Sequence, residues 1–347
     1  GTFNFTVTAV NDEEVVATNT GTTVNEASSG NVLTTAMLET TDVDNTAAQL
    51  TYTVTAATGN GTLRLSGTAL GVSDTFTQAD IDAGNVTYDH NGSETVSDSF
   101  DFDVDDGAGT SSSGTFNITI TPVNDEEVLA TNTGTTVNEA STGNVFTTAM
   151  LETTDVDNTA AQLVYTVTAA TGNGTLRLSG TALGVSDLFT QADIDGGLVT
   201  YDHNGGETLS DAFDFNVDDS QGTSSSGTFN ITVTPVNDEE VLATNTGATV
   251  SEASTGNVIT TAMLETTDVD NTPAQLVYTV TSATGNGTLR LSATALGASD
   301  TFTQADIDGG LVTYDHDGSE TVSDSFDFSV DDGTGTSSSG TFNITVT

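Results

Sequence analysis

Hydrophobic and polar residues alternate along short stretches of this chain, and the alternation has the two-residue period of β-strands. In the segment SFDFDVDD, Phe100, Phe102 and Val104 are separated by aspartates. This pattern places an apolar face toward a core and a charged face toward solvent. Other segments with strand patterns are residues 32–40, 49–54, 61–66, 86–89 and 115–120.

One short segment predicts a helix instead. In FTQADIDAG, Thr77 and Asp80 have the Thr-x-x-Asp spacing of a capping pair, and Gly84 provides a left-handed stop. We expect one or two helical turns that close one end of a domain. About seven short strands in roughly 100 residues, rich in Thr and Val, predict an antiparallel β-sandwich with Greek-key connections.

The whole pattern recurs with a fixed period. The motif VNDEEV has its aspartate at Asp12, Asp125 and Asp238, and both differences, 125 − 12 and 238 − 125, equal 113 residues. The chain is therefore predicted to be all-β, with three tandem copies of one sandwich. We place the copies at residues 11–122, 123–235 and 236–347, and interpret residues 1–10 as the final strand of a preceding copy plus a linker.

The first eight residues, GTFNFTVT, nearly repeat residues 340–347, GTFNITVT. Two interpretations stay open. The chain is a segment of a longer array, or it is a filament subunit that lends residues 1–8 to a like chain by β-strand addition. We favour the array because residues 340–347 already supply the last strand of the third copy.

Charge and composition exclude several classes of partner. The chain has 50 acidic residues against three arginines and no lysine, which gives a formal net charge of −47. Nucleic-acid binding needs a basic surface, so we expect no nucleic-acid partner. No apolar run is long enough to span a bilayer, and we expect no membrane insertion in this segment. Without cysteine, the fold depends on its core, on metal, or on both.

Many acidic residues fall in predicted loops near the junctions between copies, which we call joints. The recurring motifs are VNEA, TTDVDN, VDDG and VND. Calcium binds six to eight hard oxygen ligands from carboxylates and carbonyls, whereas zinc and copper prefer nitrogen or sulfur. Clustered Asp, Glu and Asn without cysteine therefore favour Ca²⁺.

In this order the motifs resemble those of cadherin repeats. The segments GTLRL, FTQADIDAGNVTYDH and SDSFDFDVDDG look like the chondroitin-sulfate-proteoglycan repeat, a cadherin-like variant of giant bacterial surface adhesins. The resemblance implies calcium at each joint, held by a Glu and the linker Asn-Asp together with the Asp-x-Asp and Asp-Gly loops of the next copy.

Carried onto this sequence, the resemblance implies three sets of ligands. The first joint, before the first copy, would use Asn11, Asp12, Asp42, Asp44 and Asp106. The second joint would use Glu26, Asn124, Asp125, Asp155, Asp157 and Asp219. The third would use Glu139, Asn237, Asp238, Asp268, Asp270 and Asp332. Because Pro122 replaces the first acid of the linker and no Asp-Arg-Glu triplet occurs, we expect roughly one or two ions per joint.

Other polar residues have simpler interpretations. Asp101 and Asp103 are expected to face solvent, and position 103 becomes Asn216 in the second copy. The histidines of the three YDH motifs, at positions 90, 203 and 316, are expected to be structural, and Arg64 to pair with a carboxylate on a neighbouring strand. Asp105 and Asp106 could mimic a glycosidase pair, but no copy differs from the others in a polar cluster, so we expect no enzyme.

The sequence thus predicts a structural, non-catalytic segment of a long extracellular or cell-surface adhesin or fibre. Its partners would be neighbouring repeats of the same or like chains, and a host or matrix surface reached through other parts of the parent protein, for instance in a biofilm. The alternative is a set of adhesion modules that bind carbohydrate or protein, although there is no Trp and the tyrosines lie in strand patterns.

Overall fold

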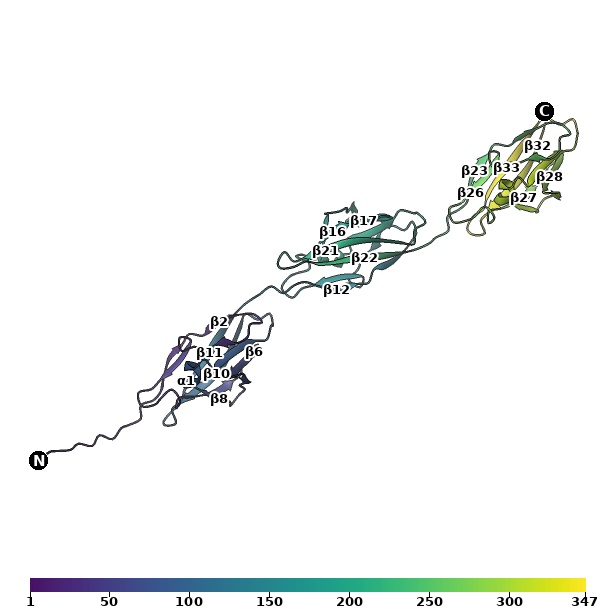
Figure 1. The fold of residues 1–347 in the computed structure, drawn as a ribbon. Helices are drawn as coiled ribbons and strands as arrows, with labels where there is room; N and C mark the ends of the chain where they lie inside the picture. Colours follow the sequence, from purple (N-terminus) through teal and green to yellow (C-terminus); the bar gives the residue numbers. More distant parts are fainter.

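The computed structural model describes residues 1–347 and contains three β-sandwiches that follow one another along the chain (Figure 1). Each sandwich has its own hydrophobic core, of 17 buried residues in the first, 17 in the second and 18 in the third. The three cores are separate clusters, so each copy packs as an independent unit. The prediction of an all-β chain of tandem sandwiches is confirmed.

The elements keep the same order in each sandwich. The first contains β1 (Val15–Asn19), β2 (Thr22–Asn25), β3 (Asn31–Val32), β4 (Leu38–Thr41), β5 (Thr51–Ala56), β6 (Gly61–Leu65), β7 (Thr68–Ala69), β8 (Thr75–Thr77), α1 (Gln78–Asp82), β9 (Val86–His90), β10 (Ser97–Asp105) and β11 (Ser112–Thr121). The second contains β12 (Val128–Asn132), β13 (Thr135–Asn138), β14 (Asn144–Val145), β15 (Leu151–Thr154), β16 (Val164–Ala169), β17 (Gly174–Leu178), β18 (Thr181–Ala182), β19 (Leu188–Thr190), α2 (Gln191–Asp195), β20 (Val199–His203), β21 (Ser210–Asp218) and β22 (Ser225–Thr234). The third contains β23 (Val241–Asn245), β24 (Ala248–Val250), β25 (Asn257–Val258), β26 (Leu264–Thr267), β27 (Val277–Ser282), β28 (Gly287–Leu291), β29 (Thr294–Leu296), β30 (Thr301–Thr303), α3 (Gln304–Asp308), β31 (Val312–His316), β32 (Ser323–Asp331) and β33 (Ser338–Val346).

Two sheets and a separate strand pair make up each sandwich. In the first, the larger sheet has the order β2-β11-β10-β5-β8 and the smaller has the order β3-β9-β6-β7, while β1 pairs with β4. All pairs are antiparallel except β2 with β11, which is parallel. This parallel pair lies at the edge of the larger sheet, where the second strand of the copy pairs with the last.

The predicted alternation matches the burial. Phe100, Phe102 and Val104 on β10 are at most 1% exposed, whereas the aspartates between them are half-buried on the outer face. On the inner side, the ring of Tyr52 stacks on that of Phe76 with their centroids 4.8 Å apart. Cross-strand aromatic packing of this kind adds to the area buried in the core.

The helix prediction is confirmed and one strand prediction is wrong. Thr77 and Asp80 form a capping box on α1, and Gly84 has a φ of +70° just beyond its end. Residues 32–40, expected to be one strand, are divided between β3 and β4. The carbonyl of Thr34 accepts hydrogen bonds from the N–H groups of Met37 and Leu38, which forms a helical turn. This turn connects β3, in the smaller sheet, to β4, which pairs with β1.

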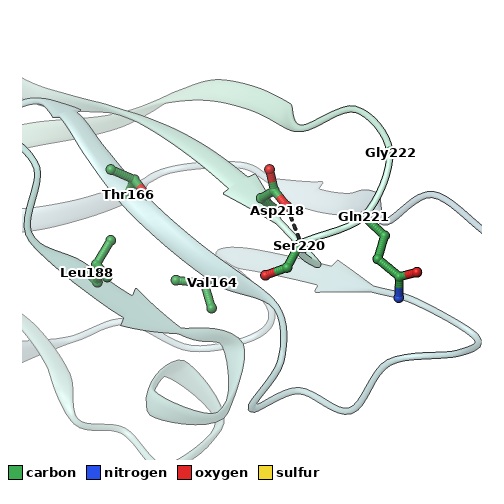
Figure 2. A pocket seen from close by; sticks show the side chains of 7 residues that line it. All are labelled: Val164, Thr166, Leu188, Asp218, Ser220, Gln221 and Gly222. Atoms are coloured by element: carbon green, nitrogen blue, oxygen red, sulfur yellow. Dashed lines mark hydrogen bonds between the residues drawn. The ribbon is translucent and has the colours of Figure 1, made fainter.

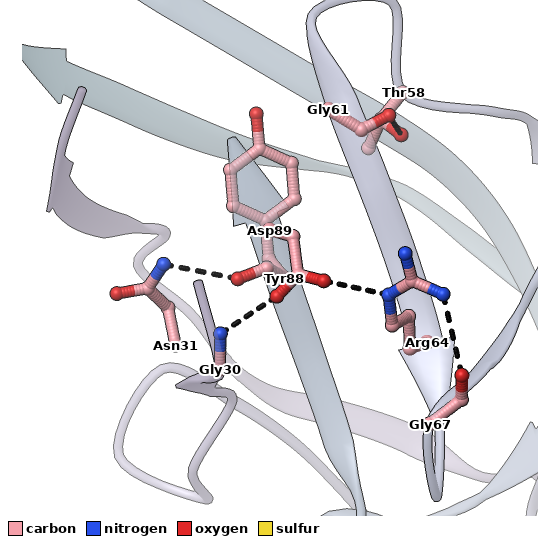
Figure 3. A network of polar contacts seen from close by, with 8 residues as sticks. All are labelled: Gly30, Asn31, Thr58, Gly61, Arg64, Gly67, Tyr88 and Asp89. Atoms are coloured by element: carbon pink, nitrogen blue, oxygen red, sulfur yellow. Dashed lines mark hydrogen bonds and ion pairs between the residues drawn. The ribbon is translucent and has the colours of Figure 1, made fainter. Parts of the chain in front are cut away.

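The three arginines pair locally, as expected. Figure 3 shows Arg64 of β6 donating from Nε to Asp89 of β9 over 2.6 Å. The other oxygen of Asp89 accepts the N–H of Gly30 at 2.6 Å. These two bonds, with the N–H of Gly30 as the larger influence, lower the pKa of Asp89. Asp89 therefore joins β6 through the ion pair and the loop before β3 through the N–H of Gly30.

Residues 1–14 contain no strand or helix, and Phe3, Phe5 and Val7 are 90%, 91% and 89% exposed. The structure therefore tests neither interpretation of the first eight residues. The three helices have five residues each, and none has the length and hydropathy needed to cross a membrane.

Candidate metal centre at the joints

The linker of the second joint is fixed onto the second sandwich by its two predicted ligands. The Nδ2 of Asn124 donates to Oδ2 of Asp219 over 2.7 Å. The backbone N–H of Asp125 donates to Oδ2 of Asp157, also over 2.7 Å. Asp157 in turn donates its own N–H to Oδ1 of Asp155, which closes a tight turn in the TTDVDN loop. Three carboxylates, one side-chain amide and the backbone of the linker thus meet at one end of the sandwich.

The same arrangement recurs at the other two joints. Asn11 donates to Asp106 over 2.8 Å, and Asn237 donates to Asp332 over 2.8 Å. The linker aspartates Asp12 and Asp238 donate their N–H groups to the second aspartate of each Asp-x-Asp loop, over 2.9 and 2.7 Å. These bonds depend on short-range geometry within one sandwich, because they form even in the first copy, which has no sandwich before it in this chain.

Two glutamates of the preceding sandwich face this linker at the second joint. Carboxylate oxygens of Glu26, Glu94 and Asp157 all lie within 4.8 Å of one another. Glu26 follows β2, Glu94 lies in the loop between β9 and β10, and Asp157 belongs to the next sandwich. The third joint repeats this group with Glu139, Glu207 and Asp270.

Carboxylates this close repel one another unless a cation compensates their charge. Only one member of each group is buried, whereas Glu94 and Glu207 are exposed. Glu26 is 7% exposed and Glu139 is 6% exposed. One oxygen of each, Oε1, is buried and has no hydrogen-bond donor. Desolvation, followed by the nearby Glu26 and Asp157, raises the pKa of Glu94 to about 7. The equivalent surroundings raise the pKa of Glu207 to about 7. Like-charged carboxylates have this effect unless a cation compensates them.

The sequence analysis missed Glu94 and Glu207 as members of these groups. A signal was present, because NGSE, NGGE and DGSE follow each YDH motif at the same offset. The loop that carries Glu94 is shaped by His90, which is 6% exposed. Its Nδ1 accepts the N–H groups of Ala27 and Gly92, at 3.2 and 3.3 Å. This ring therefore orients both loops of the group, in agreement with the structural role expected for the histidines.

The remaining predicted ligands act within one sandwich. Asp155 and Asp219 hold the turn and the linker, and they lie outside the group formed by Glu26, Glu94 and Asp157. The Nδ2 groups of Asn11 and Asn237 are the main cause of the lowered pKa of Asp106 and of Asp332, respectively. At the first joint the predicted acids meet one another, with no glutamate from a preceding sandwich.

Two other features offer no catalytic arrangement. Asp105 and Asp106 each accept a backbone N–H from two residues further along, so both carboxylates shape the loop after β10. A hollow of about 570 Å³ lies on the second sandwich, between Val164, Leu188 and the loop at Gln221. Figure 2 shows the side chains that line it. The one carboxylate among them, Asp218, accepts the N–H of Ser220.

Comparison with known proteins supports the fold and the repeat. A family model described as cadherin-like matches residues 2–120, 128–233 and 241–346. Extracellular matrix organizing protein FRAS1 of Mus musculus is 32% identical over 354 residues, covering 95% of this chain and 9% of that protein. Chondroitin sulfate proteoglycan 4 of Homo sapiens is 38% identical over 151 residues, covering 43% of this chain and 6% of that protein. The chain thus spans less than a tenth of either relative.

Solved structures show a similar fold at low sequence identity. The extracellular cadherin domains 1–5 of protocadherin gamma B2 match with a TM-score of 0.56 and 14% identity, over 98% of this chain and 61% of that one. Human CDH23 EC21-23 matches with a TM-score of 0.52 and 15% identity, over 94% and 97%. The relatives are extracellular matrix or cell-surface proteins, so the predicted location is confirmed. Because they are animal proteins, a bacterial source stays a prediction.

Proposed function

Because this chain belongs to the cadherin-like family, we propose that it is a structural, non-catalytic segment of a long extracellular adhesin or fibre. In this proposal calcium ions join consecutive sandwiches into a stiff rod. The role of the rod is reach and mechanical continuity between other parts of the parent protein, which would contact matrix or cell surfaces. A bacterial parent would do the same within a biofilm.

The observation that carries this proposal is the group of carboxylates shared across the second joint and, with equivalent residues, across the third. Glu26 and Glu94 belong to one sandwich and Asp157 to the next, and their oxygens lie within 4.8 Å of one another. Carboxylate oxygens without nitrogen or sulfur ligands fit a hard cation such as Ca²⁺. When bound, the ion would supply the positive charge that the group lacks and would hold the two sandwiches at one angle.

The charge of the chain explains why the metal would matter mechanically. With a formal net charge of −47, consecutive sandwiches repel one another. The acids at the joints add a short-range repulsion where only a few linker residues connect the sandwiches. A cation at the joint converts this repulsion into attraction, so stiffness would depend on calcium.

The other functions considered have no specific support in the structure. Adhesion modules for carbohydrate or protein would need an exposed aromatic surface on each sandwich, and the only exposed aromatic side chains, Phe3 and Phe5, lie before the first sandwich. Exchange of residues 1–8 between like chains stays a prediction, because this segment has no strand partner in the structure.

Small-angle X-ray scattering tests the proposal on the full chain. We expect the longest dimension to be greater and better defined in Ca²⁺ than in chelator at the same ionic strength. The double variant Asp157→Ala, Asp270→Ala should behave in Ca²⁺ as the unaltered chain does in chelator. An unchanged long dimension on calcium removal would overturn the proposal.

A further inference from the structure

Buried carboxylate oxygens without a partner are not scattered over this molecule. Eight buried side-chain oxygens or nitrogens lack a hydrogen-bond partner, and all eight are carboxylate oxygens. Two of them are the Glu26 and Glu139 oxygens at the joints. The other six form three equivalent pairs, one pair in each sandwich: Glu14 with Asp42, Glu127 with Asp155, and Glu240 with Asp268.

The strand register places the two members of each pair opposite one another. Val128 of β12 pairs with Thr154 of β15, so the next residues outward, Glu127 and Asp155, stand across from each other. Alternation then fixes their direction. Thr153, which shares its face with Asp155, is 2% exposed, and Leu129, which shares its face with Glu127, packs against the core. Both carboxylates therefore point to the inner side at the end of the sandwich.

The second oxygen of each carboxylate is already held by backbone N–H groups. Oε1 of Glu127 accepts the N–H of Ser225 over 2.6 Å. Oδ1 of Asp155 accepts the N–H groups of Asp157 and Asn158, over 2.7 and 2.9 Å. Bonds this short are typical of charged acceptors. Each side chain is thus held by backbone donors at one oxygen, and its other oxygen has no partner.

Burial leaves these free oxygens without water as a substitute partner. Glu14, Glu127 and Glu240 are 3%, 4% and 4% exposed, the lowest values among the acidic residues of the chain. A buried carboxylate without compensation is strongly disfavoured, and two that face each other are more so. The same pair is present in every copy, including the first, so its cause lies within the sandwich.

We propose that each of these three Glu–Asp pairs binds one divalent cation of the Ca²⁺ type. Each site would lie within a single sandwich. Glu127 and Asp155 supply two carboxylate ligands, and Ca²⁺ accepts carbonyl oxygens and waters for the rest of its coordination. Such an ion would tie β12 to β15, the two-stranded pair that lies apart from the main sheets. The site differs from the group shared across the joint, and it stands whether or not calcium joins the sandwiches.

Calorimetric titration of the chelator-stripped full chain with Ca²⁺ tests this proposal by counting ions. The triple variant Glu14→Gln, Glu127→Gln, Glu240→Gln should lose three ions per chain, one for each pair. Glutamine keeps the shape and an oxygen for the bond from serine. The single variant Glu127→Gln should lose one ion, and its two unaltered sandwiches report folding if the triple variant is unstable.

Glu126→Gln is the matched control, because the same charge is removed one residue away. Its Oε2 accepts the N–H and the hydroxyl of Thr223, over 2.8 and 3.0 Å, so it has partners already. This variant should keep every ion. An ion count that stays the same in Glu127→Gln would overturn the proposal. An equal loss in Glu126→Gln would overturn it too, because ion binding would then follow the total charge rather than the buried pair.

The joint proposal fails or stands separately in the same titration. Glu26→Gln with Glu139→Gln should remove the ions of the two shared groups and leave the three within the sandwiches. If that double variant keeps every ion while the triple variant loses three, the joint proposal is wrong and the present one holds.

Discussion

Two equivalent glutamates, one in the second copy and one in the third, have different surroundings. Glu139 and Glu252 occupy equivalent positions, and each donates its N–H to the last strand of its own sandwich, over 2.9 and 3.0 Å. At the third joint Glu139 is 6% exposed and lies near Glu207 and Asp270. At the far end of the third sandwich, where no further sandwich follows in this structure, Glu252 is exposed.

The difference shows which parts of the candidate metal site come from the sandwich itself and which come from the next sandwich. The backbone of each copy orients the glutamate in the same way, so the repeat alone prepares half of a metal site. The linker N–H of Val236, which donates to Glu139, and the carboxylate of Asp270 come from beyond the sandwich. Copies of one sequence therefore differ in chemistry according to their place in the array.

The largest expected effect comes from neutralising the glutamate at each of the two places. Glu139→Gln should weaken calcium binding at the third joint by on the order of a hundredfold, about 2.8 kcal/mol, because a buried charged ligand is lost. Glu252→Gln should leave the calorimetric titration unchanged, because no ligand from another sandwich lies near it. Equal titrations for the two variants would mean that the neighbour does not build the site.

The fold was predictable because its signals are local. Alternation at Phe100, Phe102 and Val104 and the capping pair at Thr77 are each visible within a few residues. The break between β3 and β4 was not, because residues 32–40 keep a strand-like composition and the turn depends on the two strands pairing with different partners.

The site was only partly predictable because it depends on distances between loops. The motif order indicated Glu26 and Asp157, which the structure brings together. Glu94 joins them on a loop that His90 shapes, and the recurring NGSE after YDH marks this glutamate without placing it at the joint. Glu127 has no strand pattern of its own in VNDEEV, and its place across from Asp155 is inferred only from the pairing of Val128 with Thr154.

Histidine replacement separates folding from metal binding. His203 and His316 each accept two backbone N–H groups at Nδ1, at 3.1 to 3.2 Å. Replacing either by alanine leaves these donors unpaired, so thermal or denaturant unfolding should show a loss of about 1–2 kcal/mol in the affected sandwich. Only His203→Ala should also weaken calcium binding, because its loop carries Glu207. If His316→Ala weakens calcium binding equally, the effect does not come from the loop that places Glu207 at the third joint.

The pH dependence of the joint gives a smaller and reversible test. The pKa of Glu207 is raised from 4.5 to about 7 in the folded, metal-free chain. The folded state then binds more protons than the unfolded state between these values, so the stability of the metal-free joint should fall as pH rises from 4.5 to 7. Calcium favours the ionised form and should lower this pKa.

Carboxyl NMR titration of Glu207 with and without chelator measures the shift directly. The signal of Glu320, the equivalent residue at the far end, should not respond to calcium. A Glu207 titration that is identical in both conditions would remove the carboxylate from the joint site. The same linkage predicts an effect of pH on calcium binding. Calcium affinity at the joint should decrease as pH falls below about 7, because protons and the cation compete for the same oxygens.

The smallest expected effect concerns an acid that faces solvent. Asp103 lies on the outer face of β10 and pairs in register with Thr53 and Ser113, and the second sandwich has Asn216 in its place. Asp103→Ala should change the free energy of unfolding by less than about 0.5 kcal/mol, because surface substitutions away from buried contacts have little effect. Its calcium titration should match that of the unaltered chain, whereas Asp157→Ala should weaken binding at the second joint. If both variants weaken calcium binding equally, the ions respond to the overall charge of the chain rather than to the carboxylates at the joints, since only an unspecific ion atmosphere treats the two acids alike.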